Sequence, residues 1–466
     1  MAVSNIGVFA FPFLRGVVLA HLLSPQDFGQ AISITTVASV VDIISDVGLY
    51  QYALRISSAS AMPTLQTIGL IRGVFIAAII VLCSPLCAYL FNAPGTAWAY
   101  AVVGLVPLIR GFYHLNVKTA MRSFDFGKEA VTELVGQALW MVVSIVAAFV
   151  LHDYRAMIIG LLANALSIVG MTHLLSKSRW TLGWNRAVIK DALRFGRPMV
   201  PNGAATVLVT MGDRTLVGSY LTLDALASYS VLTTSAFLPR SALLRYLNTL
   251  MTPQFVHASV PEEVDRLLIK SAIILSWVGG FFAFGYMAVG QPVIASVFGK
   301  HYAVRQGIVS LIAILSCIRF ISAMTTPIGL AKGNTGLVLL NTATSGIGIG
   351  LGVVAMLHTR TLEAMIGGMC VGEIGALIYI IGKLVGSNKA SASGVWAAIL
   401  PTLMLVVGCA SVLYVSEFDS LLPKVIVCSG FLVGETAVLA AVMIFKAISL
   451  RNIAGLFLPK RLHASA

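Results

Sequence analysis

Long apolar stretches, repeated almost from end to end, constrain this chain more than any other feature of its sequence. Fourteen of them approach the roughly 20 residues that an α-helix needs to cross a bilayer. They lie at about 3–22, 30–53, 68–91, 96–114, 131–151, 155–175, 198–220, 226–250, 269–298, 303–326, 335–357, 363–385, 395–415 and 425–446. Twelve spans is the alternative count, if two weaker stretches merge or lie in the interface. The prediction is an all-α polytopic membrane protein.

Composition agrees with that prediction. Charged residues make up 11% of the chain and hydrophobic ones 58%, whereas soluble domains carry about 25% charged residues. So little charge cannot cover a water-exposed surface, so the surface must face lipid. The net charge of +13 sits mostly in short loops rather than in a basic patch, which argues against nucleic acid as a partner.

The positive charges also predict the topology. If the amino terminus starts in the cytoplasm, 24 Lys and Arg residues fall on the cytoplasmic side and 5 on the outer side. This bias favours fourteen spans, with both termini cytoplasmic, in a bacterial inner membrane. The first apolar stretch begins close to Met1, lacks a basic flank and contains Arg15, so it is predicted to be a span and not a cleaved signal peptide. The amino terminus looks short, and a few further residues are expected before Met1.

A weak internal repeat predicts how the spans are grouped. The spacing from Pro85 to Phe91 recurs from Pro292 to Phe298, and other short matches share an offset close to 200 residues. Two halves of like topology, related by an axis along the membrane normal, are a common transporter plan. The predicted domains are a six-helix bundle at 1–175, an amphipathic cytoplasmic linker at 176–197, a second six-helix bundle at 198–385, and two further helices with a cytoplasmic tail at 386–466.

Ionisable residues inside the spans are the candidates for function, because each costs several kcal/mol unless it faces a cavity or a partner. Arg15 lies in the first span, Asp42 and Asp46 in the second, and Asp213 and Arg214 in the seventh. Arg15 and Arg214 fall at similar depth in the two halves. Arginine binds phosphate bidentately and stays charged, which suits an anion site. The alternatives are that Arg15 pairs with Asp42 or Asp46 and locks two spans, and that Arg214 snorkels to the outer headgroups.

Further charged residues lie toward the inner ends of spans or within later ones. The arginines are either topology determinants or a basic entrance for a phosphorylated headgroup, and the two glutamates are weak candidates for relaying protons or cations. These residues are Arg55, Arg240, Arg245, Arg319, Glu373 and Glu435.

Motifs for enzymatic chemistry are missing from the sequence. No GxxxxGK[ST] phosphate loop, Ser/His/Asp order or paired-carboxylate motif occurs, and the outer loops are short. The six cysteines lie in apolar stretches without a CxxC pair, and the eight histidines are scattered. The sequence therefore predicts a transporter, not an enzyme, with no cofactor and no metal.

Several segments resemble a known family. RGVVLAHLLSPQDFGQA at 15–31 is similar to the first helix and loop of polysaccharide flippases in the multidrug/oligosaccharidyl-lipid/polysaccharide exporter superfamily. DVGL at 46–49, followed by Arg55, resembles the end of their second helix. Asp213–Arg214 and the stretch 224–229 resemble the start of their second half, although Ala227 replaces the usual glycine. The resemblance covers about 80 residues in motif.

This resemblance implies two six-helix bundles around a central, water-filled cavity, plus two extra helices. It implies alternating access that moves undecaprenyl-diphosphate-linked oligosaccharide units from the inner to the outer leaflet, for O-antigen (lipopolysaccharide), capsule or exopolysaccharide synthesis. Arg15, Arg55 and Arg214 become candidates to hold the diphosphate or sugar, with Asp42, Asp46 and Asp213 as charge partners or ion-coupling groups. Expected partners are the lipid-linked substrate, membrane lipids, and a polysaccharide polymerase with its chain-length machinery.

Three other functions stay open at this point. A cation-coupled multidrug exporter of the same superfamily would usually have twelve spans and acidic cavity groups. A peptidoglycan-precursor flippase is separated only weakly from the first interpretation. A membrane polymerase or ligase would need a large outer loop with catalytic groups, and the sequence has none.

Overall fold

The computed structural model describes most of the chain. The described residues are 2–44, 48–56, 59–123, 125–176, 178–197, 199–258, 261–324, 335–388, 392–418 and 420–445. Regular structure within these ranges is helical throughout, with no strand. The predicted all-α fold class is therefore confirmed.

The chain divides into two compact units. The first comprises Met1–Val231 with Val297–Tyr302, and the second comprises Leu232–Ser296 with Ala303–Ala466. Helix α12 contributes to both units, because it runs from Leu223 to His257.

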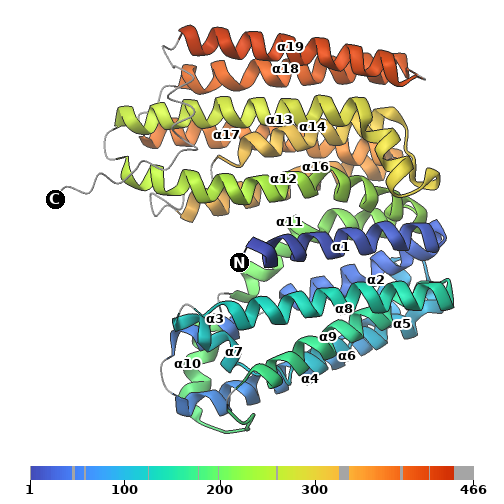
Figure 1. Ribbon diagram of the computed structural model, residues 1–466, viewed down its shortest axis with the longest axis vertical. Helices are drawn as coiled ribbons and strands as arrows, with labels where there is room; N and C mark the ends of the chain where they lie inside the picture. Colours follow the sequence, from blue (N-terminus) through green and yellow to red (C-terminus); the bar gives the residue numbers. More distant parts are fainter. Residues whose placement is uncertain are drawn as a thin grey trace. The chain divides into compact units, whose positions relative to one another are not determined.

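Figure 1 shows the helices coloured along the chain. The α-helices before α12 are α1 (Ala2–Leu22), α2 (Pro25–Ile44), α3 (Leu49–Arg55), α4 (Met62–Leu90), α5 (Ala97–Val103), α6 (Leu105–Arg110), α7 (Asn116–Thr119), α8 (Gly127–Leu151), α9 (Arg155–Leu175), α10 (Arg186–Gly196) and α11 (Met199–Tyr220). After α12 come α13 (Pro261–Val297), α14 (Gln306–Ser322), α16 (Thr335–Thr359), α17 (Leu362–Asn388), α18 (Ala392–Ser416) and α19 (Leu421–Phe445). Short 3-10 turns lie at Ala59–Ala61 (η1), Pro94–Thr96 (η2), Ala120–Ser123 (η3) and Lys300–Tyr302 (η4).

Each of the fourteen predicted apolar stretches coincides with one described helix or with a broken pair. Eight described helical segments are long and apolar enough to cross a membrane, and three shorter apolar helices accompany them. The protein is accordingly a multi-pass membrane protein. The count of fourteen crossings, the sidedness of the termini and the domain boundaries stay predictions.

Two predicted spans are interrupted. The stretch 30–53 becomes α2 and α3, and α3 is preceded by Gly48 at φ 65°, a left-handed conformation that glycine adopts without strain. The stretch 96–114 becomes α5 and α6, which meet at Gly104. A side chain at Gly104 would press on the carbonyl oxygen of Ala77 in α4, so glycine is needed for this close approach.

Glycines also let helices pack backbone to backbone. A methyl group at Gly368 or Gly372 of α17 would overlap the backbone of Gly352 or Gly348 of α16. Small residues at a spacing of four allow this approach in membranes, where van der Waals packing drives helix association. The contact fixes the depth and rotation of α17, and it therefore positions Glu373, the next residue along the chain.

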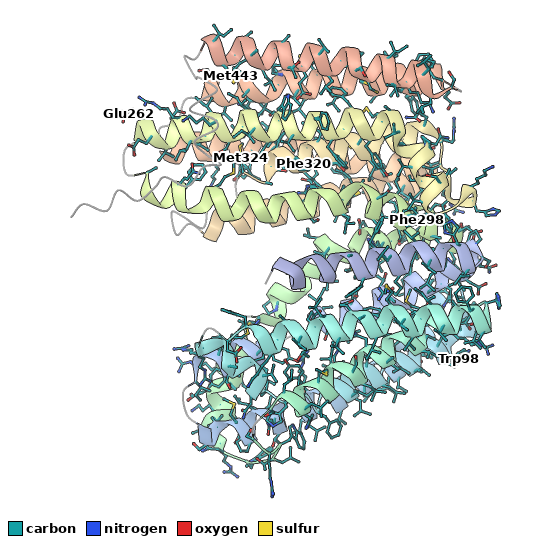
Figure 2. All side chains as sticks on the ribbon, in the orientation of Figure 1. Trp98, Glu262, Phe298, Phe320, Met324 and Met443 are labelled. Carbon is teal, nitrogen blue, oxygen red and sulfur yellow. The ribbon has the colours of Figure 1, made fainter. Side chains whose placement is uncertain are left out.

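In the first unit, α8 packs on α9 by the same principle. Gly136 of α8 lies under Ile168, and Gly160 of α9 lies against Ser144 and the indole of Trp140. Outward-facing side chains are apolar along much of these and other helices, as Figure 2 illustrates. Phe149, for example, is 59% exposed. A lipid-facing surface accounts for such exposure.

Helix α10 lies in the predicted linker, and its amphipathic character is clear. Asn185 caps its start by accepting hydrogen bonds from the backbone N–H groups of Ala187 and Val188. Ala192 on its inner face joins an apolar cluster with side chains of α3, α4 and the segment after α6. The opposite face is exposed and mainly basic, with Arg186, Lys190 and Arg194.

Candidate functional site

The best candidate site in the first unit is built around Arg15. This residue lies on α1 and is 9% exposed. Its guanidinium carbon stacks on the ring of Trp140 from α8, 3.6 Å from the ring centroid. The indole is itself fixed by the close packing of α8 on Gly160 of α9. Arg15 is thus held by an aromatic face rather than by a carboxylate among the described residues.

The hydrogen-bonding capacity of Arg15 is incompletely used. Its Nε and Nη1 atoms are buried and have no hydrogen-bond partner among the described residues. A cation–π contact in a desolvated setting contributes about 2 kcal/mol, whereas burying an unpaired charge costs several kcal/mol. The stacking on Trp140 therefore offsets only part of the free-energy cost of burying the Arg15 charge. An anion that accepts hydrogen bonds from the N–H groups at Nε and Nη1 would offset the remainder.

Other buried polar atoms lie on α8, which carries Trp140, and on α9, which packs against α8. The described residues include four such atoms on α8 and α9 without a hydrogen-bond partner: Gln137 Oε1, Trp140 Nε1, Ser144 Oγ and Asn164 Nδ2. Native interiors leave few polar groups unpaired. Three of the four atoms belong to groups that donate hydrogen bonds, and the fourth is the Gln137 amide oxygen, which accepts them. A polar ligand could satisfy both kinds of group.

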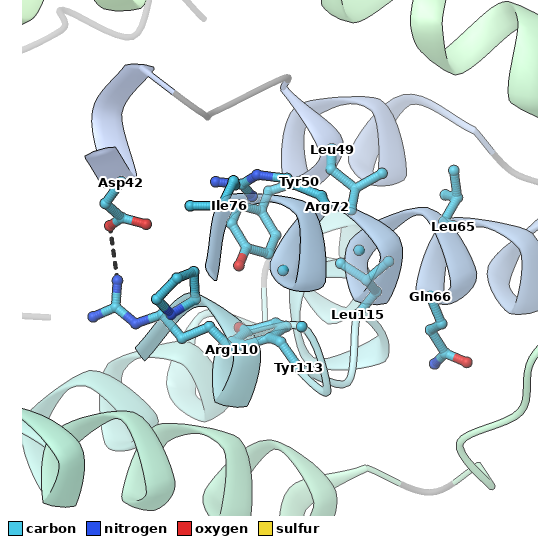
Figure 3. Close-up of a pocket in the computed structure, with 14 residues that line it drawn as sticks. Asp42, Leu49, Tyr50, Leu65, Gln66, Arg72, Ile76, Arg110, Tyr113 and Leu115 are labelled. Atoms are coloured by element: carbon cyan, nitrogen blue, oxygen red, sulfur yellow. Dashed lines mark hydrogen bonds and ion pairs between the residues drawn. The ribbon is translucent and has the colours of Figure 1, made fainter. Parts of the chain in front are cut away.

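Asn164 connects this region to an ion pair. Its Oδ1 accepts a hydrogen bond of 3.3 Å from Nη2 of Arg110, at the end of α6. Nη1 of Arg110 lies 2.7 Å from Oδ2 of Asp42 on α2, as the dashed line in Figure 3 marks. Asp42, one of the two predicted partners of Arg15, is therefore paired with Arg110. Arg110 is not among the site residues that the sequence indicated.

A pocket opens beside this ion pair (Figure 3). It encloses about 450 Å³, including its open mouth. Its wall carries polar groups from α2, α3, α4, α6 and the segment after α6, and they are Asp42, Tyr50, Gln66, Arg72, Arg110 and Tyr113. The lining holds two arginines, Arg72 from α4 and Arg110 from α6, and the charge of Arg110 is balanced by Asp42.

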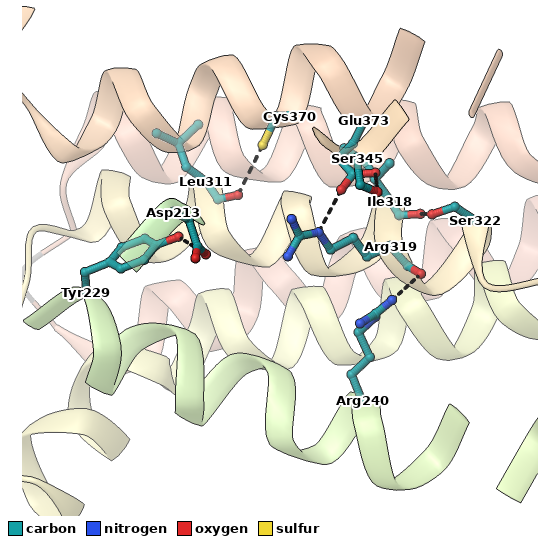
Figure 4. A network of polar contacts seen from close by, with 10 residues as sticks. All are labelled: Asp213, Tyr229, Arg240, Leu311, Ile318, Arg319, Ser322, Ser345, Cys370 and Glu373. Carbon is teal, nitrogen blue, oxygen red and sulfur yellow. Dashed lines mark hydrogen bonds and ion pairs between the residues drawn. The ribbon is translucent and has the colours of Figure 1, made fainter. Parts of the chain in front are cut away.

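The remaining first-unit candidates are arranged differently. Asp213 is 8% exposed, and its Oδ2 accepts a hydrogen bond of 2.8 Å from the Tyr229 hydroxyl (Figure 4). Arg214, the next residue on α11, is half-buried. Arg55 is exposed at the end of α3, with its guanidinium 5.9 Å from the Phe195 ring centroid.

In the second unit, two of the predicted entrance arginines come together. Nη2 of Arg240 on α12 donates to the backbone carbonyl of Arg319 on α14 at 2.8 Å. Nε of Arg319 donates to Glu373 of α17 at 2.9 Å, and Ser345 donates to the other carboxylate oxygen at 3.2 Å (Figure 4). Glu373 is 2% exposed, so this is a buried ion pair.

Two predicted site residues cannot be placed in detail. Asp46 lies outside the described residues. Arg245 lies on α12, but its side chain is not among those described. Their assigned roles stay predictions, as do those of the other site residues.

The residues that sequence reasoning missed are Trp140, Asn164 and Arg110. A usable signal existed for the α8 residues, because Glu133, Gln137 and Trp140 recur at helical spacing inside an apolar stretch. No comparable signal pointed to Asn164.

Comparison with known proteins now gives these features a context. The model of the family described as "Polysaccharide biosynthesis protein" matches residues 18–306, well over half of the chain. The chain belongs to this family. Two proteins whose names refer to polysaccharide biosynthesis are similar to this chain. The succinoglycan biosynthesis transport protein ExoT of Rhizobium meliloti (strain 1021) is 24% identical over 319 residues, which are 67% of this chain and 64% of the relative.

The amylovoran biosynthesis protein AmsL of Erwinia amylovora is 26% identical over 187 residues, 39% of this chain and 47% of that protein. Both matches cover less than two thirds of the relative's length.

Solved structures of two transporter types share the fold of this chain. The lipid II flippase MurJ, in an inward closed conformation, superposes with a TM-score of 0.68 at 11% identity, over 95% of this chain and 99% of that one. An inward-facing multidrug resistance transporter of the MATE family, from the MOP superfamily, gives a TM-score of 0.60 at 14% identity, over 82% and 95%. At these identities the likeness shows the fold alone.

Proposed function

We propose that this protein is an inner-membrane flippase that moves undecaprenyl-diphosphate-linked oligosaccharide units from the inner to the outer leaflet during surface polysaccharide synthesis. Family membership, the names of the two relatives and the exporter fold support transport in a polysaccharide pathway. One observation carries the proposal for this chain: Arg15 is nine-tenths buried, stacked on Trp140, and retains N–H groups without a partner among the described residues.

The chemistry of the substrate fits this arrangement. A diphosphate presents several anionic oxygens, and a guanidinium fork binds such oxygens bidentately. The neighbouring amides, hydroxyls and indole N–H of α8 and α9 suit a sugar, which carries both donors and acceptors. Arg15 would take the phosphate charge, while Gln137 and Asn164 would bind hydroxyl groups.

The other predicted arginines take secondary places in this proposal. Arg214 and Arg55 are proposed contacts for the diphosphate or sugar at other stages of transport. Arg240, Arg245 and Arg319 are proposed entrance residues, although Arg319 already pairs with Glu373. In this proposal, the substrate headgroup replaces Glu373 as the partner of Arg319 on binding, and Glu373 takes its place again on release. This competition keeps the diphosphate from binding too tightly to be released.

Two other functions found in the same superfamily compete with this proposal. A multidrug exporter would carry cationic or apolar compounds, for which a buried arginine is unfavourable. A peptidoglycan-precursor flippase would carry a similar diphosphate lipid with a different headgroup. A deletion strain distinguishes these functions by what the cell loses, which is surface polysaccharide, drug resistance or peptidoglycan.

Polysaccharide export in a deletion strain tests the proposal. The strain should lose surface polysaccharide and regain it with the wild-type gene. Arg15→Ala should reduce export, normalised to protein level, by a factor on the order of 100, since a charge-assisted bidentate contact contributes about 3 kcal/mol. Arg15→Lys should restore part of the activity, because lysine keeps the charge but lacks the fork.

Arg155→Ala is the matched control, because Arg155 is exposed at the start of α9, where it pairs with Asp153 and lies 5.8 Å from the Trp98 ring centroid, away from Arg15. It should leave export unchanged. A deletion strain that exports normal polysaccharide but becomes drug-sensitive would reject the proposed function. Normal export by a stable Arg15→Ala protein would reject only the role of this residue.

A further inference from the structure

Glu435 lies at a position where a carboxylate is difficult to explain. It is on α19 and is fully buried, with 0% exposure. It faces α13 at Gly280 and α18 at Thr402, all within the second unit. The site is therefore enclosed by helices on either side, away from lipid and water.

The contacts of Glu435 are few. Oε1 accepts one long hydrogen bond, 3.4 Å from the Thr402 hydroxyl. Oε2 has no hydrogen-bond partner among the described residues. Both oxygens lie so close to Gly280 that a methyl group there would overlap them. The glycine thus leaves a notch in α13, and the carboxyl group fills that notch.

No cation faces this carboxyl group among the described residues. The other buried charges of the second unit are engaged elsewhere, since Arg319 pairs with Glu373 and Lys424 donates to Gln291 and Gln306. Among the described residues, Cys317 on α14 is a titratable group that interacts electrostatically with Glu435, and a thiol cannot balance a negative charge. Glu373, by contrast, has both an arginine and a serine as donors.

These surroundings determine the protonation state. The desolvation free energy of an isolated carboxylate in a low-dielectric interior is far larger than the stabilisation from its single hydrogen bond. The group is therefore expected to bind a proton and become neutral. One hydroxyl also falls well short of the six to eight oxygens that Ca²⁺ takes, or the octahedral set of Mg²⁺. The ligand that suits the notch is a proton.

We propose that Glu435 is a proton-binding site that holds the helix pair α18–α19 against α13. With the proton bound, the neutral acid packs into the notch at Gly280. When the proton leaves, the carboxylate requires water or a cation, and the pair must separate from α13 to provide it. The inference concerns this helix pair alone and does not depend on what the protein transports.

Infrared spectroscopy and thermal unfolding of the purified, detergent-solubilised protein test this site together. A carbonyl stretching band of a protonated carboxyl group should be present at neutral pH in the wild type and lost in Glu435→Gln. The wild-type melting temperature should fall as pH rises from acidic values toward the alkaline range, because the unfolded chain ionises this carboxyl group at a lower pH than the folded protein does. Glu435→Gln, which stays neutral and keeps the shape, should lose most of that slope.

Glu262→Gln is the matched control, because Glu262 is exposed in the first turn of α13. It should keep both the infrared band and the pH slope of the wild type. An unchanged band in Glu435→Gln, or equal pH slopes in the wild type and Glu435→Gln, would overturn the proposal. Stabilisation of the wild type by sodium ions that Glu435→Gln does not share would also overturn it, in favour of a cation site.

A second pair of variants tests the notch itself. Gly280→Ala should lower the melting temperature by displacing the carboxyl group, while Gly285→Ala on the same helix should not, because an added methyl there has no atom within 4 Å. Glu435→Ala should relieve part of the Gly280→Ala defect by removing the displaced group. Equal effects of the two glycine substitutions, or full additivity in the double variant, would contradict the arrangement.

Discussion

At the scale of single residues, the sequence indicated which charges matter but not how they pair. Arg15 and Asp42 stand out because ionisable groups are rare in spans. Their partners, however, come from helices distant in the sequence: Trp140 for Arg15 and Arg110 for Asp42. A hydropathy pattern contains no information on which helix faces meet, so such pairs could not be predicted from one sequence.

The Arg110–Asp42 pair gives a residue-scale prediction. Asp42 is half exposed, so the pair should contribute modestly, with a coupling energy on the order of 1 kcal/mol. Arg110→Ala and Asp42→Ala should each lower the unfolding free energy, and the double variant should lose less than the sum. A double-mutant cycle on the purified protein measures this coupling. Strict additivity of the two losses would show that the pair contributes nothing.

At the scale of elements, the apolar stretches predicted where helices lie, and polar and glycine positions decided where they break. The predicted span over 96–114 contains two short helices, α5 and α6, which meet at Gly104 where α4 approaches. Close glycine contacts between α16 and α17 were not predicted, since glycines are frequent in all spans. A glycine is needed only where the backbone of a neighbouring helix comes close, and one sequence does not show where that happens.

The α16–α17 contact gives the element-scale prediction. Gly372→Ala should destabilise the protein by about 1–3 kcal/mol, because the added methyl overlaps Gly348. It should also weaken the Arg319–Glu373 pair by shifting α17. Gly375→Ala, on the exposed side of the same helix with no atom within 4 Å of the added methyl, should instead be neutral or slightly stabilising. The melting temperatures of the two variants measure this difference. A change in the same direction for both variants would argue against the contact.

At the scale of the whole molecule, the multi-pass membrane class followed from composition and apolar periodicity, and the motifs near Arg15 pointed to a polysaccharide biosynthesis family. The reason is that the bilayer imposes helix length and loop charge on any sequence. The positive-inside bias predicts sidedness as well, which the structure alone does not provide.

Topology is therefore the whole-molecule prediction. In a cysteine-free background, a cysteine at Ala187 on the exposed face of α10 should react only after permeabilisation of the inner membrane. A cysteine at Gly95, in the exposed turn before α5, should react with an impermeant reagent from outside. Ala187 is preferable to Asn185, whose side chain caps α10. Labelling of both positions from the same side would refute the predicted map.

Direct translocation tests the central claim. The purified protein is reconstituted into vesicles that contain a fluorescent undecaprenyl-diphosphate oligosaccharide in both leaflets, and a membrane-impermeant reagent quenches the outer leaflet. The account predicts that wild-type protein makes the inner-leaflet pool accessible to the quencher, whereas Arg15→Ala leaves it protected, as in protein-free vesicles. Quenching that stops at the outer-leaflet fraction with folded wild-type protein under an imposed ion gradient would contradict the account.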